Sequence, residues 1–277
     1  MPSQKLRFLN KACIIRDAHE DLTPDGETSN PWSLCTVEQV EELKALIKVI
    51  PIWSTEIMIS MTMNQTSIPV LQANSMDRHI TLNLQILVGS FSMFIIISLI
   101  VWLALYDRIM VPVESKIRGK PSGLGLKARM GTELAFSVAA MASWATAESL
   151  CRRIAIEQGI MGDLEAVVNM SAIWLLPQYI LSGFGEAFNA IGQNEFFYTE
   201  FPKTMSSIAA SLYRVGSSVS TLVASFILNA VDFVTTREGK KRWVTSNIND
   251  GHYDYYLWLL AGLSLDNLVY YIVCSKA

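Results

Sequence analysis

Charged residues are scarce in this chain of 277 residues, where they make up 17% of the total against 51% for hydrophobic residues. Ordinary soluble domains have about 25% charged residues, so this composition favours a protein that crosses a membrane several times. The formal net charge is only −3, and a nucleic-acid-binding domain would be strongly basic. We therefore expect a lipid bilayer as the partner of this chain, and no nucleic acid.

Cysteine and histidine are also few, with four and three copies. The cysteines have no CxxC or other metal-ligand spacing, which indicates free thiols. The histidines stand far apart in polar stretches, so no metal site is predicted. The motifs GxSxG, GxGxxG and the Walker loop, which mark many hydrolases and nucleotide-binding enzymes, are missing. We expect neither an enzyme nor a bound cofactor.

Long apolar stretches, in contrast, are abundant, and six of them approach the ~20 residues that a helix needs to cross a bilayer core. The predicted spans are residues 45–64, 86–106, 130–150, 170–191, 205–231 and 255–274. Thr36 and Gln39 have the spacing of a capping box just before the first span. The sequence predicts an all-α membrane protein with a cytosolic N-terminal segment, residues 1–35, and a six-helix transmembrane domain, residues 36–277.

Lysine and arginine are concentrated in the N-terminal segment and between the second and third spans. The positive-inside rule then places both termini in the cytosol. Six spans in this order can form two groups of three in inverted topology, which is the plan of half a major-facilitator bundle.

Glu186 lies inside the fourth predicted span. It is surrounded by small residues that permit close helix packing: Gly183, Gly185, Ala187 and Ala190. A carboxylate at this depth costs at least ~2.5 kcal/mol on insertion scales, so it must face a partner or a watery cavity. A structural ion pair is one interpretation. A substrate or proton site is the other, and it is the default for an intramembrane acid. At the outer end of the third span, Glu148 and Arg152 have the i,i+4 spacing of a surface ion pair.

Several segments, spread over nearly the whole chain, resemble the C-terminal half of the plant NRT1/PTR family, a branch of the proton-coupled oligopeptide transporters. The similar segments are residues 8–15 (FLNKACII), 40–44 (VEELK), 50–53 (IPIW), 106–112 (YDRIMVP), 129–131 (RMG), 170–174 (MSAIW), 174–202 and 249–254 (NDGHYD).

The resemblance implies the C-terminal half of a solute carrier that is driven by a proton gradient and carries nitrate, peptides or other small organic anions. The first, second, fourth and fifth spans would line a central cavity, and Glu186 would match the family's tenth-helix acid. Candidate cavity residues are Trp53, Gln65, Gln178 and Asn189. Asp107 and Arg108, at the cytosolic end of the second span, would form part of a gate; a solvated helix end is the alternative.

Glu56 and Arg214 depart from the family's usual residues. They lie at similar depths, roughly 16 and 14 Å from the cytosolic ends of the first and fifth spans at 1.5 Å per residue. Because the resemblance makes these helices neighbours, we predict an intramembrane Glu56–Arg214 ion pair. The alternative is that each side chain snorkels separately or lines the cavity.

Other departures bear on the activity. Family members have twelve helices, and neither their first-helix ExxER motif nor the fourth-helix lysine that pairs with the acid at Glu186 is present. Met63 occupies the position of a histidine that a nitrate-transporting member uses. A second interpretation is therefore a truncated half that transports nothing alone, or a membrane partner of a full-length transporter. The missing N-terminal six-helix half is a predicted partner. The plasma membrane is the expected location, with a vacuolar or other membrane as the alternative.

Overall fold

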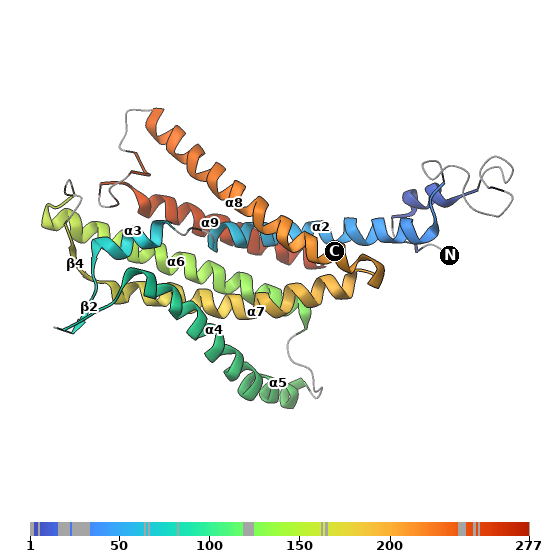
Figure 1. Cartoon of the computed structure of the whole chain (residues 1–277), viewed down its shortest axis with the longest axis horizontal. Helices are drawn as coiled ribbons and strands as arrows, with labels where there is room; N and C mark the ends of the chain where they lie inside the picture. The colour runs from blue at the N-terminus through green and yellow to red at the C-terminus, as the bar shows by residue number, and fades with distance from the viewer. Residues whose placement is uncertain are drawn as a thin grey trace.

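Long helices that lie side by side make up most of the structure (Figure 1). The computed structural model describes residues 3–4, 6–15, 23, 34–63, 65, 67–81, 83–118, 125–161, 163, 166–237, 242–245, 248 and 250–276. The six predicted spans fall on six long helices: α2 (Val37–Met63), α4 (Met93–Leu105), α6 (Leu126–Gln158), α7 (Leu176–Glu200), α8 (Ser206–Arg237) and α9 (Tyr253–Lys276).

Short elements connect the long helices. The helical ones are η1 (Arg7–Cys13), α3 (Ser67–Ser75), η2 (Val88–Ser92), η3 (Tyr106–Met110), α5 (Val111–Arg118), η4 (Ala172–Leu175) and η5 (Lys203–Met205). Four short strands lie at the end of the bundle opposite the start of α2 (Figure 1). They are β1 (Met76–Asp77), which pairs in parallel with β4 (Val168–Ser171), and β2 (His79–Thr81), which pairs antiparallel with β3 (Leu84–Gln85).

Five helical stretches of the described chain are long and apolar enough to cross a membrane: Val37–Ser75, Val88–Val113, Leu126–Gln158, Ser207–Arg237 and Tyr253–Lys276. α7 is not among them, and its polar side chains include Glu186 and Asn189. With 25 residues it is nevertheless long enough to span a bilayer, and it packs along both α6 and α4. The fourth predicted span is thus a helix surrounded by the other helices of the bundle, with a polar face.

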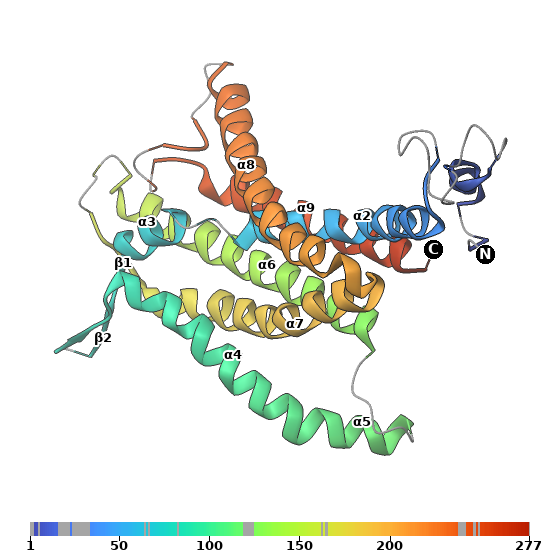
Figure 2. The same ribbon diagram turned by 45° about the vertical axis from the view of Figure 1, so that its right-hand side comes forward.

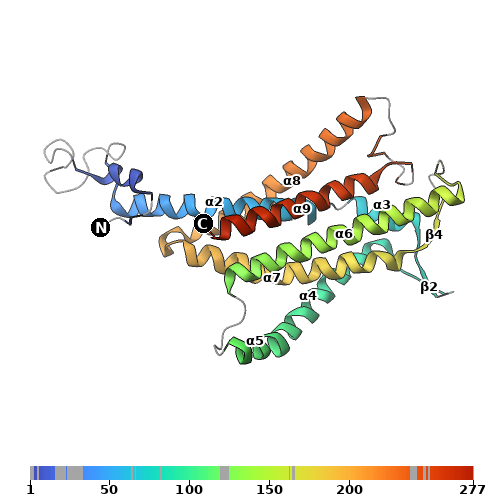
Figure 3. The same cartoon turned by 180° about the vertical axis from the view of Figure 1, so that it is seen from behind.

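α6 holds the bundle together, with α7 on one side and α9 on the other (Figure 3). Aromatic rings join α4, α6 and α7: the centroid of Trp102 on α4 lies 4.6 Å from that of Phe184 on α7, and the centroid of Phe136 on α6 lies 6.1 Å from that of Phe188 on α7. Each such pair adds about 0.5–1.5 kcal/mol beyond the area it buries. Because Phe184 and Phe188 are i,i+4 neighbours on one face of α7, Glu186 lies on another face.

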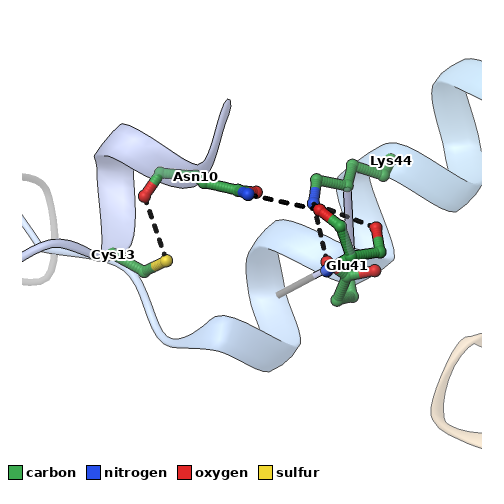
Figure 4. A network of polar contacts seen from close by, with 5 residues as sticks. Asn10, Cys13, Glu41 and Lys44 are labelled. Carbon is green, nitrogen blue, oxygen red and sulfur yellow. Dashed lines mark hydrogen bonds and ion pairs between the residues drawn. The ribbon is translucent and has the colours of Figure 1, made fainter. Parts of the chain in front are cut away.

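The predicted capping box at the start of α2 is confirmed. The Thr36 backbone N–H donates to Gln39 Oε1 at 2.9 Å, and the Gln39 backbone N–H donates to Thr36 Oγ1 at 3.2 Å. The N-terminal part of α2 also holds the segment before it through Lys44, whose Nζ donates to Glu41 Oε1 at 2.7 Å and to the Ser3 carbonyl oxygen at 3.1 Å (Figure 4). These contacts fix η1 against the helix that begins the membrane domain.

Two segments predicted as polar loops are partly regular. α3 lies within the segment that follows the first span, and α6 continues eight residues past the predicted end of the third span at residue 150, up to Gln158. Polar residues near the predicted end of that span do not end the helix, because tertiary contacts satisfy them. The Glu148 carboxylate is buried and accepts a hydrogen bond from Gln72 of α3 at 2.5 Å, so the predicted surface pair with Arg152 is wrong.

Candidate functional site

A cavity of about 470 Å³ opens between α2, α4, α6, α7 and α8. The four helices expected to line it all contribute residues, and α6 forms a fifth wall that was not expected. α8 and α4 diverge from the rest of the bundle toward opposite sides (Figure 2). The residues of these two helices that line the cavity, 95–99 of α4 and 213–217 of α8, lie in the first half of each helix.

Three carboxylates line the cavity, each from a different helix: Glu56 from α2, Glu133 from α6 and Glu186 from α7. Their exposure differs strongly. Glu186 is exposed, while Glu56 and Glu133 retain only 6% and 1% of their accessible surface. The site thus has one acid that solvent reaches directly and two that the helices enclose.

Glu133 is the acid that the sequence analysis missed. Its Oε1 accepts a hydrogen bond from the side-chain amide of Asn189, which also lines the cavity. Its Oε2 is buried and has no hydrogen-bond partner within the described part of the chain. The rule that selected Glu186, an ionisable residue inside a predicted span, applies equally to Glu133, but the third span was not assigned to the cavity.

Trp53 connects two walls of the cavity. Its indole Nε1 donates to the carbonyl oxygen of Leu212 on α8 at 3.0 Å. Gly216, one turn further along α8, has no side chain there; a Cβ atom would lie 3.0 Å from the same indole nitrogen. The ring is therefore held against α8 by a hydrogen bond and a close approach, and it lines the cavity as predicted from its position.

Two residues that were predicted to line the cavity, Gln65 and Gln178, lie outside it. Gln65 is buried near the end of α2, where its side-chain amide donates to the Met61 carbonyl oxygen at 3.3 Å and its Oε1 accepts from Tyr256 at 3.5 Å. Gln178 is buried in the first turns of α7. Neither belongs to the cavity lining.

Glu56 and Arg214 are both described by the structure, and they do not form the predicted ion pair. Their side chains lie in different environments. Glu56 is enclosed beside the cavity, whereas Arg214 is exposed on α8. Tyr213, Gly216 and Ser217 are the residues of α8 that face the cavity. A depth estimate places residues along a helix axis but does not fix the direction of their side chains, which is why similar depths did not produce a contact.

The cavity is acidic as a whole. Among its 17 lining residues, all within the described chain, there is no lysine, arginine or histidine. Hydroxyl groups of serine and tyrosine, apolar side chains of α4 and Met63 complete the wall. Three carboxylates without a lining cation create a negative potential, which attracts protons and positively charged groups and repels anions.

Asp107 and Arg108, the predicted gate, lie in the short π-helical segment η3 that joins α4 to α5. Both residues are exposed. A π-helical turn within a membrane helix changes the direction of the side chains that follow, and such turns often occur at functional sites. The gate role stays a prediction.

These features define a class: a multi-pass helical bundle, open on one side, with an acid-lined cavity between its helices. The structure is similar to the crystal structure of the POT family transporter PepTSo, with a TM-score of 0.62 at 15% identity, over 86% of this chain and 42% of that one. The predicted fold, a six-helix half of a major-facilitator bundle, is thereby confirmed.

Sequence comparison identifies the family. The POT family profile matches residues 4–244, and the chain belongs to this family of transporters. Two Arabidopsis thaliana relatives, Protein NRT1/PTR FAMILY 1.2 and 1.1, are 56% and 55% identical over 99% of this chain. Protein NRT1/PTR FAMILY 8.3, also from Arabidopsis thaliana, is 39% identical over 96% of it. The chain spans about half the length of these relatives, 46%, 46% and 45% respectively.

Proposed function

We propose that this chain is the C-terminal half of a proton-coupled solute carrier. The observation that supports the proposal is the cavity whose wall includes Glu56, Glu133 and Glu186. Acids at membrane depth are costly and therefore rare, and those that occur often serve as proton relays. Alternating access in this fold places the cargo site between two six-helix halves, so the open side of the cavity would face the N-terminal half.

The charge of the wall bears on the cargo. Nitrate, peptides and other small organic anions were the candidates from sequence. A wall whose described residues include three carboxylates and no basic side chain disfavours a bare anion such as nitrate, unless the acids are protonated first. A peptide-like zwitterion has an ammonium group that carboxylates can bind, and the rings of Trp53 and Tyr213 can attract the same group. Among the three candidates, we infer that short peptides fit this half of the cavity best.

Uptake in oocytes tests the proposal. The chain is expressed alone and together with the N-terminal six-helix half of an Arabidopsis relative, and labelled dipeptide and labelled nitrate are offered in acidic and neutral media. We expect dipeptide uptake that increases in acidic medium when both halves are present. Uptake of neither solute, with both halves shown at the cell surface, would contradict the proposed function.

The same experiment separates a carrier half, which transports only when the other half is present, from a truncated protein that transports in neither case. Uptake only on co-expression assigns this chain the role of one half. The plasma membrane is the proposed location, and a fluorescent fusion expressed in plant cells tests it against the vacuolar membrane.

A further inference from the structure

The C-terminal end of α6 lies beyond the apolar core of the bilayer. The predicted third span ends at residue 150, and α6 continues from there to Gln158, which adds roughly 12 Å at 1.5 Å per residue. Arg153, Glu157 and Gln158 in this extension are exposed. Charged side chains that face lipid at the depth of the hydrocarbon core are costly, so these last turns of α6 lie in water.

β4 lies beside this end of α6 (Figure 3). The Asn169 backbone N–H donates to the side-chain oxygen of Gln158, the last residue of α6, at 3.3 Å. Ala155 of α6 belongs to the same buried apolar cluster as Val168 and Met170 of β4. These contacts place Asn169 at the level of the helix end, and therefore outside the hydrocarbon core.

The Asn169 side chain points away from the protein. Successive side chains of a strand face opposite sides, and both neighbours of Asn169 on β4, Val168 and Met170, are buried. Asn169 is accordingly exposed, and within the described chain no hydrogen bond occupies its side-chain amide. A bulky group attached to this amide would extend into solvent without displacing any packed side chain.

Asn169, Met170 and Ser171 form the sequence Asn-x-Ser with a residue other than proline in the middle, which is the acceptor motif for N-linked glycosylation. The strands lie at the end of the bundle opposite the start of α2 (Figure 1). With both termini in the cytosol, as the positive-inside rule predicts, this end lies on the outer side. That is the side on which the glycosylating enzyme of the secretory pathway acts.

We propose that Asn169 is a site of N-linked glycosylation, with a lipid-linked oligosaccharyl diphosphate as the donor. The side-chain nitrogen of Asn169 forms a bond to the anomeric carbon of the oligosaccharide and loses one proton. The bond between that carbon and the diphosphate oxygen breaks, and the lipid diphosphate leaves with the electron pair. The attached sugar is bulky and solubilising, so it keeps this end of the bundle on the outer side of the membrane.

A second acceptor motif occupies residues 64–66 (NQT), and Asn64 and Thr66 lie outside the described residues. α2 ends at Met63, which lines the cavity, and the predicted first span ends at residue 64. This motif therefore begins at the membrane boundary, whereas Asn169 stands beside a helix that extends well past it. We expect Asn64 to stay unmodified, which makes it the matched control.

Electrophoresis of the tagged chain expressed in plant cells tests the site, with and without an endoglycosidase that removes N-linked sugars. We expect one band of reduced mobility, which the enzyme converts to the mobility of the bare polypeptide. Asn169→Gln and Ser171→Ala should each abolish the slower band. Asn64→Gln should retain it, and so should Ser171→Thr, which keeps the hydroxyl that accepts from the Ile173 backbone N–H at 3.4 Å.

A wild-type chain whose mobility does not change with the endoglycosidase would overturn the proposal. A slower band that persists in Asn169→Gln and disappears in Asn64→Gln would do the same. If Asn169→Gln is degraded, Ser171→Ala decides, because it removes the motif and leaves Asn169 in place. The site does not depend on the proposed function: a glycosylated chain without dipeptide uptake would refute transport and leave the modification standing.

Discussion

Gly183 of α7 and Ile95 of α4 meet backbone to backbone. A Cβ atom on Gly183 would lie 2.4 Å from the Ile95 carbonyl oxygen and 2.8 Å from the Ser98 Cβ. Real Cβ atoms do not approach a carbonyl oxygen so closely, so any side chain at this position would force the two helices apart. Gly183 therefore lets α4 pack directly against α7, which is the close helix packing expected from the small residues around Glu186.

Replacing Gly183 by alanine should destabilise the bundle by about 1–3 kcal/mol, the usual cost of overpacking a well-packed contact. The measurement is the thermal unfolding midpoint of the purified chain in detergent. Gly185→Ala is the matched control on the same helix, because a Cβ there would lie 3.6 Å from its nearest neighbours, at ordinary contact distance. Equal midpoints for the two variants would show that α4 moves away from Gly183 without loss of stability.

Gln72 connects α3 to α6 at the end of the bundle that carries the strands. Its side-chain amide donates to Glu148 Oε2 at 2.5 Å, and its Oε1 accepts from the Trp144 indole at 2.6 Å. Gln72→Leu keeps the size of the side chain but deprives both partners, and each orphaned group costs about 1–3 kcal/mol. We expect a clearly lower unfolding midpoint than for Val70→Ala, an exposed position on the same helix. A midpoint equal to that of the control would mean that other groups satisfy Glu148.

The number and type of the long helices, and the start of α2, could be predicted from this sequence, but the C-terminal end of α6 could not. Apolar runs of about 20 residues determine the spans, and the local Thr36–Gln39 motif determines where α2 begins. The end of α6 depends on distant partners. Glu148 is satisfied by Gln72, and Arg152 donates to the Gly251 carbonyl oxygen at 3.0 Å. Such partners, about 75 to 100 residues away along the chain, leave no local signal.

The candidate site was also predictable only in part. Intramembrane acids are a strong signal, which is why Glu56 and Glu186 were found, and Glu133 was missed only because its helix was assigned elsewhere. The direction of side chains was not predictable. Arg214 was expected to face Glu56, but its helix presents Tyr213 and Ser217 to the cavity. Orientation around a helix axis is set by packing against neighbours, which a single sequence does not show.

Trp53→Phe should loosen the contact between α2 and α8, because phenylalanine keeps most of the ring and cannot donate to Leu212. One hydrogen bond contributes about 1 kcal/mol, so opening near Leu212 should become roughly fivefold more frequent. Hydrogen–deuterium exchange of the first half of α8 measures this change. Trp258→Phe is the control, since its indole donates to Ser149 at 3.2 Å, between α9 and α6. Faster exchange of α8 in both variants would point to general destabilisation.

Glu186→Gln should abolish proton-coupled uptake in a carrier that contains this half. Glutamine has the shape of glutamate but does not titrate, and Glu186 is the exposed acid of the cavity, with direct access to protons from water. Uptake of labelled dipeptide by the co-expressed halves should fall to background in acidic medium, and exchange of bound solute across the membrane without a gradient should persist. Loss of proton-driven uptake with exchange retained indicates a lost coupling group, whereas loss of both indicates a misfolded carrier. Glu157→Gln, exposed on α6 outside the cavity, should transport like wild type. If Glu186→Gln retains both the rate and the pH dependence of wild type, the acid at this position is structural, and coupling must be assigned to another group.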